Sequence, residues 1–104
     1  MEASPIVRIE VQIDFEWDDW KAKTNLKKHS VSFEEAQSVF SNPLAVIFND
    51  EFNSTTERRE IIIGHSAQNR VLLVAFTERR QRIRIISART ATRKEREDYE
   101  RNVF

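Results

Sequence analysis

Hydrophobic and polar residues alternate near the start of the chain, where the apolar residues Ile9, Val11, Ile13 and Phe15 are separated by polar or acidic ones. A period of two with β-branched residues predicts a strand with one buried face and one acidic face. The pattern then changes to helical spacing. Either aspartate of the pair at 18–19 can cap a helix that runs to about residue 28.

A second helix is predicted by residues 32–35, which read Ser-Phe-Glu-Glu and form a capping box. Its apolar face consists of Phe33, Ala36, Val39 and Phe40. The Asn-Pro pair at 42–43 ends this helix, because the residue before a proline is disfavoured in the α region. Two helices therefore follow the first strand.

Four β-like runs come next, over residues 44–48, 59–64, 71–77 and 82–87. The last three are joined by short polar turns, which favour antiparallel neighbours. Residues 92–95, Thr-Arg-Lys-Glu, form a second capping box that starts a highly charged C-terminal helix. The predicted fold is α+β with the order β-α-α-β-β-β-β-α, an antiparallel sheet covered by helices on one face and open to a ligand on the other.

Length and composition bound the class of protein. A chain of 104 residues has room for one domain, so we assign residues 1–104 to a single domain in which residues 1–12 form an N-terminal extension and the start of the first strand. The absence of cysteine excludes disulfides and thiolate zinc sites, and the single glycine, Gly64, excludes a P-loop and a dinucleotide fingerprint. The longest apolar run, at 71–76, is too short to cross a bilayer, and no signal-peptide pattern is visible. We therefore expect a cytoplasmic protein without membrane contact.

The formal net charge of 0 conceals an uneven distribution along the chain. Residues 1–52 carry 5 basic and 10 acidic residues, a balance of −5, whereas residues 53–104 carry 12 basic and 7 acidic residues, a balance of +5. Residues 79–96 alone contain eight basic residues, seven of them arginine. Because a guanidinium binds phosphate bidentately and stacks on bases, this segment favours nucleic acid. A solvated strand and helix decorated with charge is the alternative interpretation.

Four residues around the first helix, Trp17, Lys21, Asn25 and Lys28, are spaced to share one stripe. An aromatic ring beside two amines and an amide resembles a base-stacking platform with phosphate clamps. The alternative is a helix that lies on the sheet and extends its lysines to solvent.

The positions of the two histidines predict different roles for them. His29 closes the first helix, where it is either a structural C-terminal residue or a proton carrier. His65 follows a strand end and is interpreted as structural. Neither histidine has a metal-ligand spacing, so no metal site is expected.

Arginines offer the clearest candidate for phosphate chemistry. Arg82 and Arg84 alternate with isoleucines, so both project to one face of the last strand. Arg59 opens a neighbouring strand and Arg89 leaves the last one. Arginines on adjacent antiparallel strands can converge on one phosphate and stabilise charge that grows in a transition state.

Several long segments together resemble the BrnT family of toxins from bacterial type II toxin–antitoxin systems. The similarity covers roughly residues 13–100 and rests on positions within 15–36, Arg59 with Ile63-Gly64, residues 77–79 and 82–89, and Ala91, Arg93, Glu95, Arg96 and Tyr99. The resemblance implies a RelE-like fold and a ribonuclease that inhibits translation without a metal or cofactor. It also implies a DNA-binding BrnA-type antitoxin that neutralises the toxin and autoregulates the operon, in a hetero-oligomer dimerised through the antitoxin.

The family's motifs can be carried over residue by residue. They fall on Lys21, Asn25, Lys28, His29, Arg59, Arg84 and Arg89. The chain departs from the family at Ser30, where a glycine is usual after the histidine, and in its extension over residues 1–12.

These residues lead to a hypothesis of in-line attack by a 2′-hydroxyl on the adjacent phosphate of single-stranded RNA, which requires no protein nucleophile. His29 is the candidate proton carrier, with Glu78 as a fallback, and Arg59, Arg84 and Arg89 are the catalytic phosphate ligands. The expected RNA-binding residues are Trp17, Lys21, Asn25, Lys28, Arg82 and Arg93. The alternative is a non-catalytic RNA- or protein-binding module that acts as a co-repressor with a DNA-binding partner.

Overall fold

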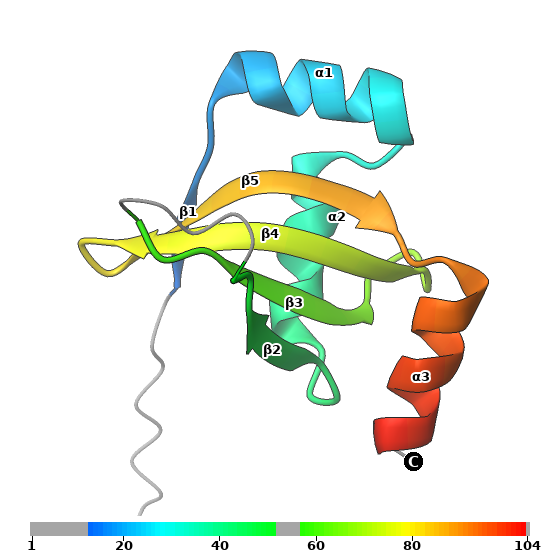
Figure 1. Ribbon diagram of the computed structural model, residues 1–104. Coiled ribbons are helices and arrows are strands. Elements are labelled where there is room, and N and C mark those ends of the chain that lie inside the picture. The colour runs from blue at the N-terminus through cyan, green and yellow to red at the C-terminus, as the bar shows by residue number, and fades with distance from the viewer. Residues whose placement is uncertain (1–12, 52–56, 104) are drawn as a thin grey trace, which may run out of the picture.

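The computed structural model describes residues 13–51 and 57–103 of the protein as an α+β domain with one five-stranded sheet. The elements in chain order are β1 (Asp14–Glu16), α1 (Asp19–His29), α2 (Phe33–Ser38), the 3₁₀ turn η1 (Val39–Ser41), β2 (Val46–Asn49), β3 (Glu60–His65), β4 (Val71–Arg79), β5 (Arg82–Thr90) and α3 (Arg93–Val103). The α2 helix lies behind the sheet, α1 lies beyond the β5 side and α3 lies at one end (Figure 1). The predicted fold class is confirmed, while residues 9–12 of the expected first strand lie outside the described residues.

All three helices begin at the caps that the sequence predicts. The Asp18 carboxylate accepts a hydrogen bond from a first-turn N–H of α1 at 2.9 Å, and the Ser32 hydroxyl does the same for α2 at 3.0 Å. At α3 both capping-box bonds form: Thr92 Oγ1 accepts from the Glu95 N–H at 3.1 Å, and Glu95 Oε1 accepts from the Thr92 N–H at 2.8 Å. These bonds satisfy N–H groups that a helix start leaves unpaired.

The end of α1 explains the position at which the sequence departs from the family pattern. Ser30 has a φ of 57° and donates its N–H to the Leu26 carbonyl at 2.9 Å. This left-handed C-cap conformation favours glycine, because other residues bring Cβ close to the backbone. Ser30 retains the cap geometry, so the substitution leaves the path of the chain after α1 intact.

The sheet has the strand order β1-β5-β4-β3-β2. Strands β2 to β5 pair antiparallel, as expected, whereas β1 pairs parallel to β5, with Glu16 opposite Arg84. Parallel neighbours need a long connection between them. The two helices and three strands between β1 and β5 supply it. The sheet is therefore mixed at one edge.

A β-bulge in β5 decides which arginines share a face. The pairing of β4 with β5 shifts by one residue, so that Ile86 is extra. Arg84 and Arg89 are an odd number of positions apart and would otherwise point to opposite faces. Their partners on β4, Thr77 and Leu73, are four residues apart and face the same way. The bulge thus brings both arginines to the face opposite α2.

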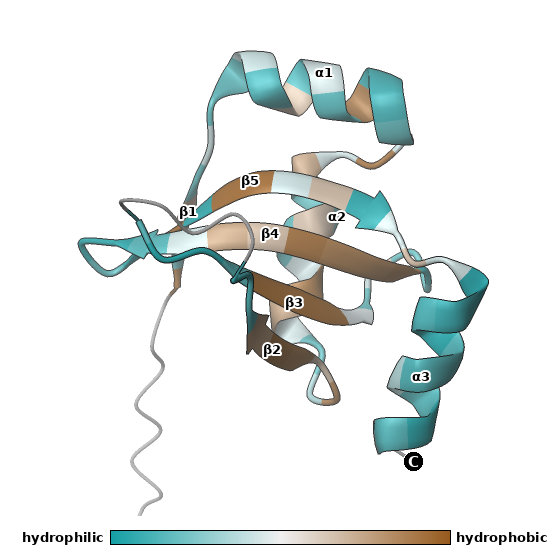
Figure 2. Cartoon of the chain, viewed as in Figure 1, coloured by the Kyte–Doolittle hydropathy of each residue, from teal (hydrophilic) through white to brown (hydrophobic). Residues whose placement is uncertain are grey.

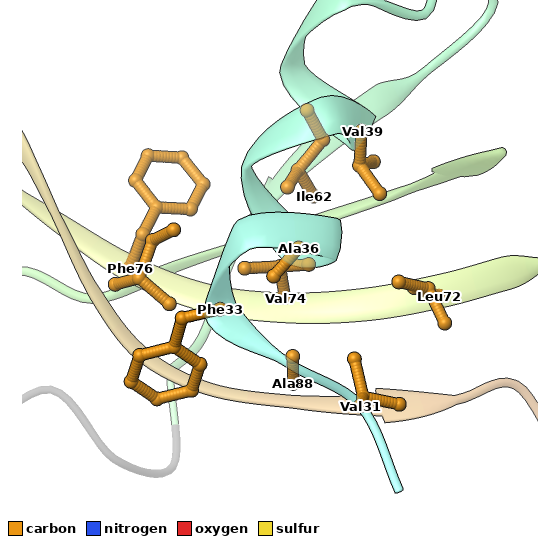
Figure 3. Close-up of a cluster of buried hydrophobic side chains, with 10 residues drawn as sticks. Val31, Phe33, Ala36, Val39, Ile62, Leu72, Val74, Phe76 and Ala88 are labelled. Atoms are coloured by element: carbon orange, nitrogen blue, oxygen red, sulfur yellow. The ribbon is translucent and has the colours of Figure 1, made fainter. Parts of the chain in front are cut away.

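The main core fills the space between α2 and the sheet (Figure 3). Phe33 of α2 and Phe76 of β4 are the largest of its fully buried side chains. The cluster consists of Val31, Phe33, Ala36, Val39, Ile62, Leu72, Val74, Phe76, Ile85 and Ala88.

A smaller apolar cluster lies on the other face of the sheet, where α3 packs. It joins Tyr99 of α3 to Ile63 and Val71, with Leu73 and Ala91 packed against it. The face that was expected to be open is therefore covered at one end by α3. Figure 2 shows that most of α3 is hydrophilic, so among the described side chains of this helix Tyr99 supplies the buried apolar contact with the sheet.

A buried ion pair fixes α2 and the end of α1 against the turn after β3. The Glu35 carboxylate, at 2% side-chain exposure, pairs with Arg70 and accepts a hydrogen bond from Ser66 Oγ at 2.7 Å. Hydrogen bonding from Arg70 lowers the pKa of Glu35, which keeps this carboxylate ionised. Arg70 also donates to the Ser30 carbonyl at 3.0 Å, next to His29.

Candidate active site

A cleft on the face of the sheet opposite α2 brings together two of the residues selected from the sequence. His29, at the end of α1, and Arg89, near the end of β5, both line it. Asp50, which follows β2, lines the same cleft and was not selected from the sequence, because nothing in its local pattern relates it to a histidine 21 positions earlier. The rest of the lining consists of Ile61, Leu73, Ala75, Ser87 and Ala88.

Arg89 is held at this cleft by the first turn of α3. Its Nη1 donates to Glu95 Oε1 at 2.7 Å and its Nη2 donates to Glu95 Oε2 at 2.8 Å. Hydrogen bonding from Arg89 is the largest cause that lowers the pKa of Glu95 to about 2, so this carboxylate is ionised at neutral pH. A guanidinium has five N–H donors, so a bidentate pair with Glu95 leaves donors for a phosphate.

Asn25 holds α1, and with it His29, against β5. Its Nδ2 donates to the Val31 and Ala88 carbonyls, both at 2.9 Å, and its Oδ1 accepts from the Ala88 N–H at 3.0 Å. The residue is 7% exposed. Its amide groups therefore have partners within the fold, and a contact of Asn25 with RNA stays a prediction.

The expected stacking platform takes a different form. Trp17 precedes α1, which begins at Asp19, and its ring packs edge-on against Phe33 with the centroids 5.9 Å apart. Lys21 and Lys28 are exposed on α1. The strongly exposed tryptophan of this region is Trp20, at 73%, which is not part of the predicted stripe.

The three arginines expected to share one phosphate are divided along the sheet. Arg84 lies at the β1 edge, where its Nη1 donates to Glu16 Oε2 at 2.8 Å, and Arg82 is near the same carboxylate at 3.9 Å. The five-residue step from Arg84 to Arg89 places their backbones roughly 15 Å apart. Arg59 directly precedes β3, and its carbonyl accepts the Asp50 N–H at 2.9 Å.

The remaining candidates are placed elsewhere. Arg93 is 86% exposed on α3 and pairs with Glu97 at 3.0 Å. Glu78 is opposite Ile83, which packs against the main core, so the fallback proton carrier faces away from the cleft. The His65 ring lies 6.0 Å from that of Tyr99, beside the smaller apolar cluster.

A family model described as the ribonuclease toxin BrnT of type II toxin–antitoxin systems matches residues 17–95. The chain belongs to this family. The 1.1 Å crystal structure of the Brucella abortus ribonuclease toxin BrnT is similar to it with a TM-score of 0.61 and 24% sequence identity, over 79% of this chain and 100% of that chain. That similarity shows a shared fold. No curated protein matches the chain.

Membership of the BrnT family makes the chain a ribonuclease toxin of a type II toxin–antitoxin system, which implies an antitoxin partner. Within the described residues, no three histidine or carboxylate side chains are grouped as a metal site would require. None of the described helices has the length and apolar character needed to cross a membrane.

Proposed function

We propose that this BrnT-family toxin is a metal-independent endoribonuclease and that the cleft between His29 and Arg89 is its active site. The observation that carries the proposal is the convergence, in one cleft, of an imidazole, a carboxylate and an arginine fixed by a bidentate ion pair. These are the groups needed to move protons and to bind a phosphate without a metal.

In the proposed reaction, the 2′-oxygen of one ribose forms a bond to the adjacent phosphorus while the bond from phosphorus to the 5′-oxygen breaks. One cleft residue takes the proton of the 2′-hydroxyl and another supplies a proton to the departing 5′-oxygen. His29 and Asp50 are the proposed pair for these steps. Arg89 binds the scissile phosphate and stabilises the charge that grows in the transition state. The products are a 2′,3′-cyclic phosphate and a 5′-hydroxyl.

The rest of the RNA is proposed to lie along the same face of β5 and across the exposed side of α1. Arg59 and Arg84 bind phosphates next to the scissile one, because both arginines lie nearer to the β4–β5 hairpin than Arg89 does. The other proposed contacts are Lys21, Lys28, Arg82 and Arg93, which are all exposed.

Cleavage of messenger RNA would inhibit translation and place the toxin's action in the cytoplasm. The proposed antitoxin is a DNA-binding protein of the BrnA type, which neutralises the toxin and dimerises the hetero-oligomer. Membership of the family implies an antitoxin partner. The type of antitoxin, its DNA binding and its dimerisation of the complex belong to the proposal.

The proposal is tested with labelled RNA and the purified toxin. Cleavage should persist in EDTA, and a 2′-deoxy sugar at the cleavage site should abolish it. His29→Ala should lower kcat by about 10²–10⁴-fold, and Arg89→Ala by about 10²–10³-fold. Arg101→Ala, which changes an exposed arginine on the last turn of α3, is the matched control and should leave kcat unchanged.

Loss of cleavage in EDTA would overturn the metal-independent mechanism. Unchanged cleavage by both active-site variants would move the active site elsewhere. A wild-type protein that binds an antitoxin but cleaves no RNA would favour the non-catalytic co-repressor.

A further inference from the structure

The tip of the β4–β5 hairpin carries a group of arginines that the active-site cleft does not use. Arg79, Arg80 and Arg82 line a polar depression there together with Glu16. Figure 1 shows this tip at the opposite end of β5 from α3, and Figure 2 shows that it is hydrophilic. The tip is therefore separate from the cleft at Arg89.

The backbone at this tip is strained. Arg79 pairs with Arg82, so the loop consists of only Arg80 and Gln81, with φ values of 49° and 67°. Two positive φ values in a two-residue hairpin are characteristic of a type I′ turn, which strongly prefers Asn-Gly. Arginine and glutamine fit the left-handed region poorly, because Cβ approaches the following carbonyl. Such strain is a reason to look for a function at the position.

The charge at the tip is incompletely balanced. Arg79 pairs with Glu57, and Arg82 shares the Glu16 carboxylate with Arg84. Arg80 is exposed and makes no ion pair within the described part of the chain. Among the described residues, the four arginines at 79, 80, 82 and 84 face three carboxylates on this side of the sheet, namely Glu16, Glu57 and Asp14, which is in register with Arg82. The depression therefore keeps a net positive charge, and Arg80 is its arginine without an ion pair.

We propose that the hairpin tip is a second phosphate-binding site, which takes a backbone phosphate of single-stranded RNA several nucleotides from the scissile one. This inference rests on the proposed function, since it extends the RNA path from the Arg89 cleft. The bulge at Ile86 places Arg82, Arg84 and Arg89 on one face of β5, so an RNA strand along this face passes all three arginines. Arg82 and Arg89 are roughly 20 Å apart along the strand, too far to share a phosphate. The site therefore selects for longer RNA.

Two single substitutions separate the charge of the turn from its strain. Arg80→Asn removes the guanidinium and supplies a residue suited to the left-handed region, whereas Gln81→Gly relieves strain and keeps every charge. Both variants should raise Tm by roughly 4–8 °C. Only Arg80→Asn should weaken RNA binding.

Binding is measured by fluorescence anisotropy with a 2′-O-methyl RNA of about twelve nucleotides, which a 2′-hydroxyl mechanism cannot cleave. Arg80→Asn should reduce affinity by roughly threefold to tenfold at low salt, and it should reduce the slope of log K against log salt by about 0.7. Gln81→Gly should leave the affinity and the slope unchanged. With cleavable RNA, Arg80→Asn should raise KM for long substrates and leave kcat unchanged.

An unchanged salt slope in Arg80→Asn, or equal losses of affinity in both variants, would overturn the inference. Failure of the wild-type protein to bind the 2′-O-methyl RNA would also overturn it. A different result would overturn the proposed function and leave this inference standing. A protein that binds this RNA with the expected dependence on Arg80, but cleaves no RNA, retains the second phosphate site and loses the ribonuclease mechanism.

Discussion

The side-chain amide of Asn25 binds both the N–H and the carbonyl of Ala88 on β5. Within the described residues, strand β1 pairs with β5 from Arg82 to Arg84 and ends there, so the edge at Ala88 lies beyond the last residue of β1. The amide therefore substitutes for a neighbouring strand at this residue, and it also satisfies the Val31 carbonyl. Through these three bonds one buried side chain sets the position of α1, and the catalytic candidate His29 lies four residues further along that helix.

Replacing Asn25 should separate its role from that of its exposed neighbours. Asn25→Ala leaves three buried backbone groups unpaired and should lower the free energy of unfolding by about 2–4 kcal/mol. Lys21→Ala, one helical turn earlier on the exposed surface of α1, should change it by less than about 0.5 kcal/mol and should weaken RNA binding instead. Chemical denaturation and RNA-binding titrations of both variants check this. Equal stability of the two variants would contradict the structural role of Asn25.

The residues of the active site could be predicted only in part, and the reason is physical. The spacing of a helix predicts which residues share a stripe, but it does not reveal that Asn25 is buried or that Trp17 packs against Phe33. His29 and Arg89, which the sequence predicts as catalytic residues, both line one cleft, and their catalytic roles stay predictions. Asp50 could not be found, because its place opposite them depends on the pairing of β2 with β3.

At the scale of elements, sequence patterns predicted every helix and strand of the described chain, since capping boxes and periodicity are local. Strand β5 nevertheless extends to Thr90, three residues beyond the predicted run, because β4 continues to supply a pairing partner. The bulge and the parallel β1 edge could not be predicted from local patterns either. Both depend on contacts between segments far apart in sequence.

The first turn of α3 couples its own cap to the active site through Glu95. This carboxylate accepts a hydrogen bond from the Thr92 N–H and also holds Arg89, so one residue serves both the helix start and the proposed phosphate ligand. Its pKa in the folded protein is about 2, below the ordinary value of 4.5. A lowered folded pKa contributes stability above about pH 4.5, and this contribution is lost as the pH falls toward 2.

Glu95→Gln should therefore be less stable than the wild type at pH 7, by about 1–2 kcal/mol once the solvent exposure of Arg89 is considered. The difference in the free energy of unfolding between the two proteins should narrow as the pH falls from about 4.5 to 2, because the wild-type carboxylate becomes protonated. Urea titrations across this range provide the measurement. Glu97→Gln, which removes an exposed partner of Arg93, is the control and should show no such narrowing. If the free energies of unfolding of Glu95→Gln and the wild type differed by the same amount at all pH values, the Glu95–Arg89 ion pair would contribute no stability.

At the scale of the whole molecule, the opposite charges of the two halves of the chain meet within the fold. Glu16 and Glu35 belong to the acidic half, and they pair with Arg84 and Arg70 of the basic half. The net charge of 0 is thus partly an internal pairing. In the proposed function, the arginines left on one face of the sheet supply the local positive field that attracts RNA, while the acidic residues elsewhere limit non-specific binding.

The two apolar clusters differ in size, and this difference predicts how the molecule unfolds. Among the described residues, ten buried ones join α2 to the sheet, whereas the cluster under α3 has three. Of these, Tyr99 is 5% exposed and donates its hydroxyl to the Leu44 carbonyl at 2.8 Å. An element with few buried contacts opens at lower free energy than the main core. We therefore expect α3 to exchange its amide hydrogens before the strands do.

Tyr99→Ala should remove about 2–3 kcal/mol from the docking of α3 and leave the main core folded. Hydrogen exchange should then accelerate throughout α3 while β4 keeps its protection, and kcat should fall because Glu95 no longer holds Arg89 at the cleft. Tyr99→Phe keeps the ring in the cluster and removes only the bond to Leu44, so it should lose about 1 kcal/mol and retain most activity. Equal acceleration of exchange in α3 and β4 would show instead that the helix and the sheet unfold as one cooperative unit, in which case Arg89 would be held by the whole fold.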